Sequence, residues 1–67
     1  MDELKQGMID AIRNNKQYDY LAIHGHEYSK EELKDIAMEL AYGLCNMTDA
    51  GRAKVAGDLT ERWKEGE

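Results

Sequence analysis

The stretch YSKEELKDIAMELAYGLC, residues 28–45, carries the clearest helix signal in this 67-residue sequence. Ser29 and Glu32 have the spacing of a capping box, in which each side chain accepts a hydrogen bond from the backbone amide of the other residue. Behind the cap, apolar residues recur with the helical period on one face: Leu33, Ile36, Ala37, Leu40, Ala41 and Leu44. We predict a helix from about Lys30 to Cys45.

Two helices are expected before this one. Apolar residues at helical spacing predict a helix over residues 2–15, with Asp2 as its N-cap. Gly7 weakens this helix by about 1 kcal/mol relative to alanine, unless another group packs closely against it. A short helix from about Gln17 to His24 is preferred to a strand, because a lone strand would have no partner in a chain that is otherwise helical. We expect Gly25 to end this helix as a left-handed C-cap.

The last helix is expected to open at Thr48 or Asp49, since both residues are good N-caps. Its apolar stripe is narrow: Val55, Ala56, Leu59 and Trp63. Beside the stripe lies a strip of small residues that we interpret as a packing surface for a neighbouring helix: Ala50, Ala53 and Gly57. Trp63 is interpreted as a lid on the core, with an interface anchor as the alternative.

The composition supports one small all-α domain. The chain has no proline and a single cysteine, so no internal disulfide can hold it together. A chain this short buries a modest fraction of its surface, so it needs good helix packing, self-association or a partner. We predict that residues 1–67 form a compact bundle of three main helices plus a short one, or a dimer of such units.

The charge and the N-terminal residues narrow the cellular context. Asp2 and Glu3 follow Met1, so we expect no signal peptide, and no apolar run has the length of about 20 residues that a membrane span needs. A lone thiol fits a reducing compartment, so we expect a cytoplasmic protein without a membrane association. The net charge of −5 argues against unaided binding to nucleic acid, whose phosphates are neutralised by Lys and Arg.

No catalytic, cofactor or metal motif stands out. The sequence has no Gly-rich phosphate loop and no paired-histidine metal helix, so we predict a protein that is not an enzyme and holds no cofactor. His24, His26 and Glu27 are weak evidence for zinc, which needs three or four ligands with defined spacing, and we expect solvent-exposed histidines instead. Cys45 lies beside the apolar stripe and is expected to behave as a small hydrophobic residue.

The middle helix is apolar over more than half of its circumference. Met38, Tyr42 and Cys45 continue the apolar surface around one side, and such a helix needs cover on two sides. We predict that these three residues form or border a partner-binding surface, with a plain core as the alternative. Asp35 and Glu39 lie with Glu32 on the polar side and are included among the partner-binding residues. If they mimic phosphates, binding to the target should weaken steeply with salt.

These features predict a protein-binding module, an inhibitor or regulator that covers a surface of a larger protein. The predicted partner-binding residues are Asp35, Met38, Glu39, Tyr42, Cys45 and Trp63. In size and compactness the chain resembles the small proteins that phages and mobile elements encode, although no motif identifies a family. Two alternatives stay open: a structural homo-oligomer or accessory subunit, and a nucleic-acid-associated transcriptional regulator.

Overall fold

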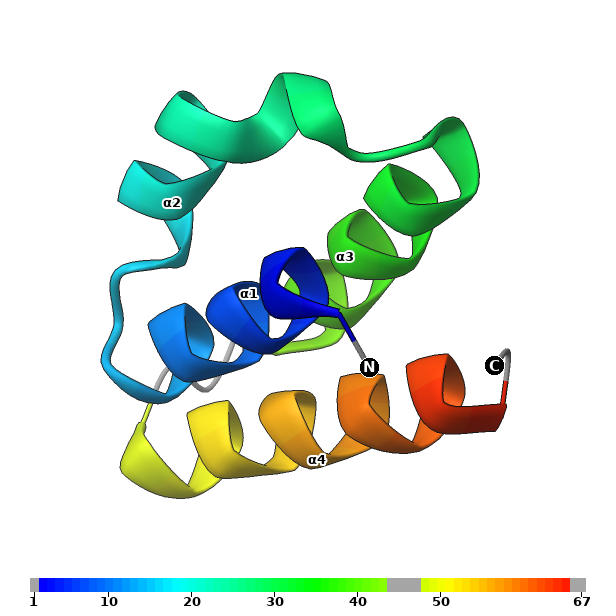
Figure 1. Ribbon diagram of the computed structural model, residues 1–67. Helices are drawn as coiled ribbons and strands as arrows, with labels where there is room; N and C mark the ends of the chain where they lie inside the picture. The colour runs from blue at the N-terminus through cyan, green and yellow to red at the C-terminus, as the bar shows by residue number, and fades with distance from the viewer. Residues whose placement is uncertain (1, 44–47, 66–67) are drawn as a thin grey trace.

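The computed structural model describes residues 2–43 and 48–65, apart from the side chains of residues 42, 43 and 65 (Figure 1). Within these residues the fold is all-α and has no strand, which confirms the predicted fold class. The elements follow the order α1 (Glu3–Arg13), α2 (Gln17–His24), the 3-10 helix η1 (Gly25–Glu27), α3 (Lys30–Gly43) and α4 (Asp49–Glu65).

The core is built from three of the four α-helices. α1 packs on α4 and α3 packs on α4, whereas α2 lies across the edge of this group and makes its main contacts with α1 and η1 (Figure 1). The core cluster of buried apolar side chains comes from α1, α3, α4 and Tyr28, which follows η1: Met8, Ile9, Ile12, Tyr28, Ile36, Leu40, Val55, Ala56, Leu59 and Trp63. The predicted stripe of the last helix is therefore entirely buried. α2 adds only partly buried apolar side chains to this core.

Local chemistry sets the start of each long helix. Asp2 caps α1 by accepting a hydrogen bond from the amide of Lys5 at 2.9 Å. The predicted capping box of α3 is present, with the Ser29 amide donating to Glu32 at 2.8 Å and the Glu32 amide donating to the Ser29 hydroxyl at 3.2 Å. At α4, the Thr48 hydroxyl accepts from the amide of Gly51 at 3.1 Å, which makes Thr48 the cap.

The left-handed residue of the first half of the chain is Asn15 rather than Gly25. Asn15 has φ 57°, and its amide donates to Ile12 while the next amide, of Lys16, donates to Ala11 at 2.7 Å. This pair of bonds is a Schellman motif, which ends α1 and turns the chain into α2. The expectation for Gly25 was wrong: its φ is −55°, and the chain continues into η1, whose turn is closed by a 3.2 Å hydrogen bond from the Tyr28 amide to the Gly25 carbonyl.

Two expectations about buried faces are corrected by the structure. On α3, Ile36 and Leu40 are buried, whereas Leu33, Ala37 and Ala41 are exposed and the polar Glu39 is buried in their place. The α3 helix is therefore rotated so that part of its polar side faces α4. On α4, the strip of small residues packs against no neighbouring helix of the described part of the chain: Ala50 and Ala53 are exposed, and a Cβ added at Gly57 would meet nothing within 4 Å.

Candidate functional site

α2 is the part of the fold whose apolar surface is least covered. Five of its eight residues are apolar and point in different directions around the helix: Tyr18, Tyr20, Leu21, Ala22 and Ile23. None of the five is buried, and the only buried side chain of α2 is the polar Gln17. Tyr18 and Ile23 are 56% and 65% exposed. Because a helix that is apolar all round is normally buried on all sides, α2 is incompletely covered within this chain.

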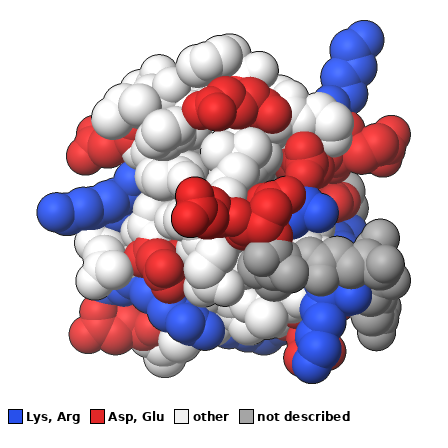
Figure 2. Space-filling view, viewed as in Figure 1, with Lys and Arg blue, Asp and Glu red and all other residues white. Residues whose placement is uncertain are grey.

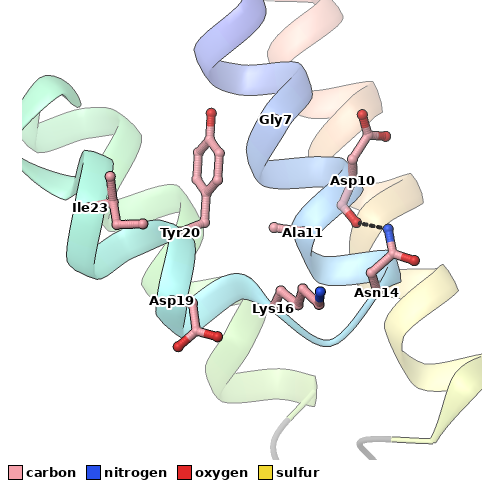
Figure 3. Close-up of a pocket in the computed structure, with 8 residues that line it drawn as sticks. All are labelled: Gly7, Asp10, Ala11, Asn14, Lys16, Asp19, Tyr20 and Ile23. Carbon is pink, nitrogen blue, oxygen red and sulfur yellow. Dashed lines mark hydrogen bonds between the residues drawn. The ribbon is translucent and has the colours of Figure 1, made fainter.

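One aromatic contact fixes α2 on α1. The ring of Tyr20 stands between the two helices with its hydroxyl toward Gly7 (Figure 3), and a Cβ built on Gly7 would lie 2.6 Å from Cζ of the tyrosine. Only glycine leaves room for this approach, which explains a helix-weakening residue in the middle of α1. The Tyr20 ring also contacts the ring of His24, with 4.5 Å between centroids.

A cleft of about 470 Å³ opens on one side of α2, between it and α1 (Figure 3). Its apolar lining comes from both helices and includes Ala11 and the exposed Ile23. Its polar lining has one carboxylate from each helix, Asp10 and Asp19, with Lys16 from the connecting loop. The complete lining is Gly7, Asp10, Ala11, Asn14, Lys16, Asp19, Tyr20 and Ile23.

No cation of the described residues pairs with the carboxylates of the cleft. Asp10 accepts a 3.2 Å hydrogen bond from the side chain of Gln6, and the side chain of Asn14 donates to the Asp10 backbone carbonyl at 2.8 Å (Figure 3). Throughout residues 2–43 and 48–65, neither Asp10 nor Asp19 forms an ion pair, and Lys16 forms none either.

A second groove, of about 440 Å³, runs along the other side of α2, between it and α3. All of its lining residues are apolar or aromatic: Tyr18, Leu21, Leu33, Ile36, Ala37, Leu40 and Ala41. Ile36 and Leu40 belong to the core, so this groove reaches the core from outside. The groove exists because α2 and α3 make few contacts with each other.

Uncharged surface is concentrated where α2 lies. In Figure 2, drawn in the view of Figure 1, the upper part of the molecule is mostly uncharged, and acidic side chains lie on it and below it. The groove between α2 and α3 has an apolar and aromatic lining, whereas the cleft between α1 and α2 also has polar and charged lining residues. We call α2 together with the linings of these two grooves the α2 surface.

The residues predicted to bind a partner fall into three groups. Asp35, Glu39 and Trp63 are brought together at the contact of α3 with α4, where Arg62 joins them. Met38 is not part of this cluster, and the residue is 38% exposed. The side chain of Tyr42 and all of Cys45 lie outside the described residues.

The cluster around Arg62 explains why the polar side of α3 faces inward. Arg62 Nη2 lies 3.0 Å from Glu39 Oε1, and its Nη1 lies 3.5 Å from Asp35 Oδ1. The indole Nε1 of Trp63 donates to Asp35 Oδ2 at 3.3 Å, while the ring itself is buried. The burial of Trp63 agrees with its interpretation from the sequence as a lid on the core. The partner-binding role of these residues stays a prediction.

Sequence reasoning missed Tyr18, Ile23 and Leu33 as exposed apolar residues. The available signal was the composition of residues 17–24, which have apolar side chains in every direction and no polar face.

The structure also describes the two histidines that gave weak evidence for a zinc site. His24 is half-buried with Nδ1 2.7 Å from Glu27 Oε2, and His26 is exposed. Among the residues that the structure places, no group of three or more His, Cys, Asp or Glu side chains is arranged to hold a metal ion.

Comparison with protein-family models gave no match, and neither did searches of curated proteins and of solved structures. In the described part of the chain, no helix combines the length and the apolar character that crossing a membrane requires.

Proposed function

We propose that this chain is a cytoplasmic protein-binding module, not an enzyme, and that it inhibits or regulates a larger protein by covering part of that protein's surface. The α2 surface is the proposed contact. The observation that carries the proposal is that α2 is apolar in all directions, yet none of its apolar side chains is fully buried, and only Tyr20 and Leu21 are partly buried.

The energetics favour a covered α2. Fully burying a large apolar side chain contributes about 1.5 to 3 kcal/mol, so covering the exposed parts of Tyr18 and Ile23 would contribute roughly 1 to 2 kcal/mol each. Tyrosine is also enriched among the residues that dominate binding energy at protein interfaces. A folded partner supplies this cover without a change in the bundle, because the core lies in α1, α3 and α4.

The test is capture of a partner by variants that differ only at the surface. Tyr18→Glu and Ile23→Glu introduce charge on α2 at positions that are already exposed, so the fold should be retained. Ala53→Glu adds the same charge on α4 at an exposed position and serves as the matched control. The immobilised proteins are exposed to a lysate of the organism that encodes the chain, and retained proteins are identified.

Each result of this assay has a defined meaning. A stoichiometric partner retained by the wild type and by Ala53→Glu, but lost from both α2 variants, supports the proposal. A partner lost from Met38→Glu and kept by the α2 variants would place the contact on α3, as the sequence predicted, and would overturn the α2 surface. Retention of the chain's own copies alone, with a dimer mass in solution, would make the protein a homo-oligomer instead.

A further inference from the structure

The groove between α2 and α3 has one wall of bulky side chains and one wall of mostly small ones. From α2, Tyr18 and Leu21 line the groove, and Tyr18 is 56% exposed. From α3, Leu33 lies at one end, and Ala37 and Ala41 follow it at intervals of one turn. These three α3 residues span about 12 Å along the helix axis, or roughly two turns. The alanines leave space for apolar side chains of another molecule, within a groove volume of about 440 Å³.

The walls of this groove offer an occupant no backbone hydrogen bonds. α2 and α3 are α-helices, so the backbone groups along the groove are paired within each helix. An extended or irregular segment that filled an apolar groove would bury its own amides and carbonyls without partners, which is unfavourable. A helix satisfies its backbone internally and can insert one row of apolar side chains into the groove. The occupant that fits is therefore an amphipathic helix with apolar residues at i, i+3 or i+4, and i+7.

Two lysines continue the α3 wall towards the start of the helix. Lys30 and Lys34 lie seven residues before Ala37 and Ala41, so each lysine falls on nearly the same side of α3 as the alanine two turns later. Both lysines are exposed, and within the described residues neither forms an ion pair. Glu31, which follows Lys30, falls about 100° away around the helix. A helix bound along this row is therefore favoured by acidic residues that face the two lysines.

We propose that the groove between α2 and α3 binds an amphipathic helix of the partner protein, with its apolar side against Tyr18 and Ala37 and with acidic residues facing Lys30 and Lys34. This inference rests on the proposed function, since it takes the α2 surface as the contact and adds the structure and the charge of the partner segment that binds there.

The probe is a library of random peptides of about 16 residues, long enough for roughly 24 Å of helix, selected for binding to the immobilised chain. We expect the enriched peptides to share apolar residues at helical spacing with acidic residues beside them, and to gain helicity in circular dichroism on binding. Ala37→Glu places a charge in the groove at an exposed position and should weaken their binding by about tenfold or more. Ala53→Glu adds the same charge on α4 and should leave the affinity unchanged.

The lysines are tested by removing and by reversing their charge. K30Q/K34Q should weaken binding of the enriched peptides about fivefold per lysine, the upper range for exposed ion pairs. K54Q/K64Q removes two exposed lysines of α4 outside the groove, so it changes the net charge equally and should leave the affinity nearly unchanged. A selection repeated on K30E/K34E should enrich peptides that keep the apolar spacing but carry basic residues in place of the acidic ones.

Three results would overturn the inference: no enrichment of peptides with helical apolar spacing, binding that survives Ala37→Glu, or the same preferred charge in the selections on the wild type and K30E/K34E. The capture assay keeps this failure distinct from failure of the proposed function. If the peptide selection fails but Tyr18→Glu and Ile23→Glu still abolish partner capture, the α2 surface stands and its occupant is different. If the peptides bind as expected but Tyr18→Glu captures the partner normally, the proposed contact is wrong.

Discussion

Replacing each of two helical glycines by alanine should change stability in opposite directions. Gly7 in α1 and Gly57 in α4 both have helical neighbours on each side, and neither has a positive φ. The two sites differ in what an added methyl group meets. Beside Gly57 there is open space, whereas beside Gly7 there is the ring of Tyr20.

At Gly57 the intrinsic helix propensity acts alone. Alanine is favoured over glycine in a helix interior by about 0.8 to 1 kcal/mol, because glycine loses more backbone freedom on folding. For a domain of this size, 1 kcal/mol corresponds to a Tm change of about 4 to 8 °C. Gly57→Ala should therefore raise Tm by several degrees.

At Gly7 the same gain is opposed by a clash. The new Cβ would come closest to the Tyr20 hydroxyl oxygen and would lie 2.6 Å from Cζ and 3.0 Å from Cε2, whereas carbon atoms in contact prefer about 3.5 to 4.0 Å. The ring must therefore move by roughly 1 Å, and overpacking of this kind costs about 1 to 3 kcal/mol. After subtraction of the propensity gain, Gly7→Ala should destabilise the protein by roughly 0 to 2 kcal/mol.

Thermal unfolding followed by circular dichroism measures both variants, and a double-mutant cycle isolates the contact. In a Tyr20→Ala background the clash is absent, so Gly7→Ala should there be stabilising by about 1 kcal/mol, like Gly57→Ala. If Gly7→Ala raises Tm in the wild-type background as much as Gly57→Ala does, Tyr20 does not pack on α1 and the placement of α2 is refuted.

Three further predictions concern the buried cluster, the tyrosine before α3 and the exposed face of α2. Arg62→Met leaves the buried Glu39 without its cation; because Arg62 is 43% exposed, the loss should be about 1 to 2 kcal/mol in urea unfolding rather than the 3 to 5 of a fully buried pair. The control Arg13→Met, which replaces an exposed arginine, should leave the free energy of unfolding almost unchanged. An equal loss of stability in Arg62→Met and Arg13→Met would contradict the role of Arg62 as the cation that pairs with Glu39. Burial raises the pKa of the Tyr28 phenol, so its contribution to stability is complete below the ordinary value of about 10 and falls as pH rises above it. Tyr28→Phe should show a shallower alkaline loss of stability, and an unchanged slope would exclude the tyrosine as its source. Ile23→Glu should change the free energy of unfolding by less than about 0.5 kcal/mol, and a larger loss would mean that Ile23 is part of the core.

The ends of the helices could be predicted because local hydrogen bonds set them. Ser29 and Glu32 cap each other through groups three residues apart, so their spacing alone identifies the start of α3. The limits of α2, Gln17 and His24, agree with the sequence prediction, although Lys16 makes no capping side-chain hydrogen bond at its start. The prediction failed at Gly25, because glycine permits a left-handed conformation without requiring it.

The orientation of the helices could not be predicted, because it depends on residues far apart in the chain. Periodicity gives the direction of the apolar stripe of α3, but it gives no sign that Arg62, 23 residues later, pairs with Glu39 and turns the polar side inward. In the same way, Gly7 and Tyr20 are separate signals in the sequence, and only the structure shows that the tyrosine ring packs against this glycine. The α2 surface depends on where α2 packs, so it was missed.

Hydrogen exchange of the backbone amides, measured in the free protein and in its complex with the captured partner, tests the central claim most directly. α2 is a short helix at the edge of the bundle with no buried apolar side chain, so its amides should exchange faster than those of α1 and α4 in the free protein. We predict that the complex slows exchange across Gln17–His24 and leaves the exposed side of α4 unchanged. Protection confined to α3 or α4, with α2 exchanging as fast as before, would contradict the claim that a partner covers the α2 surface.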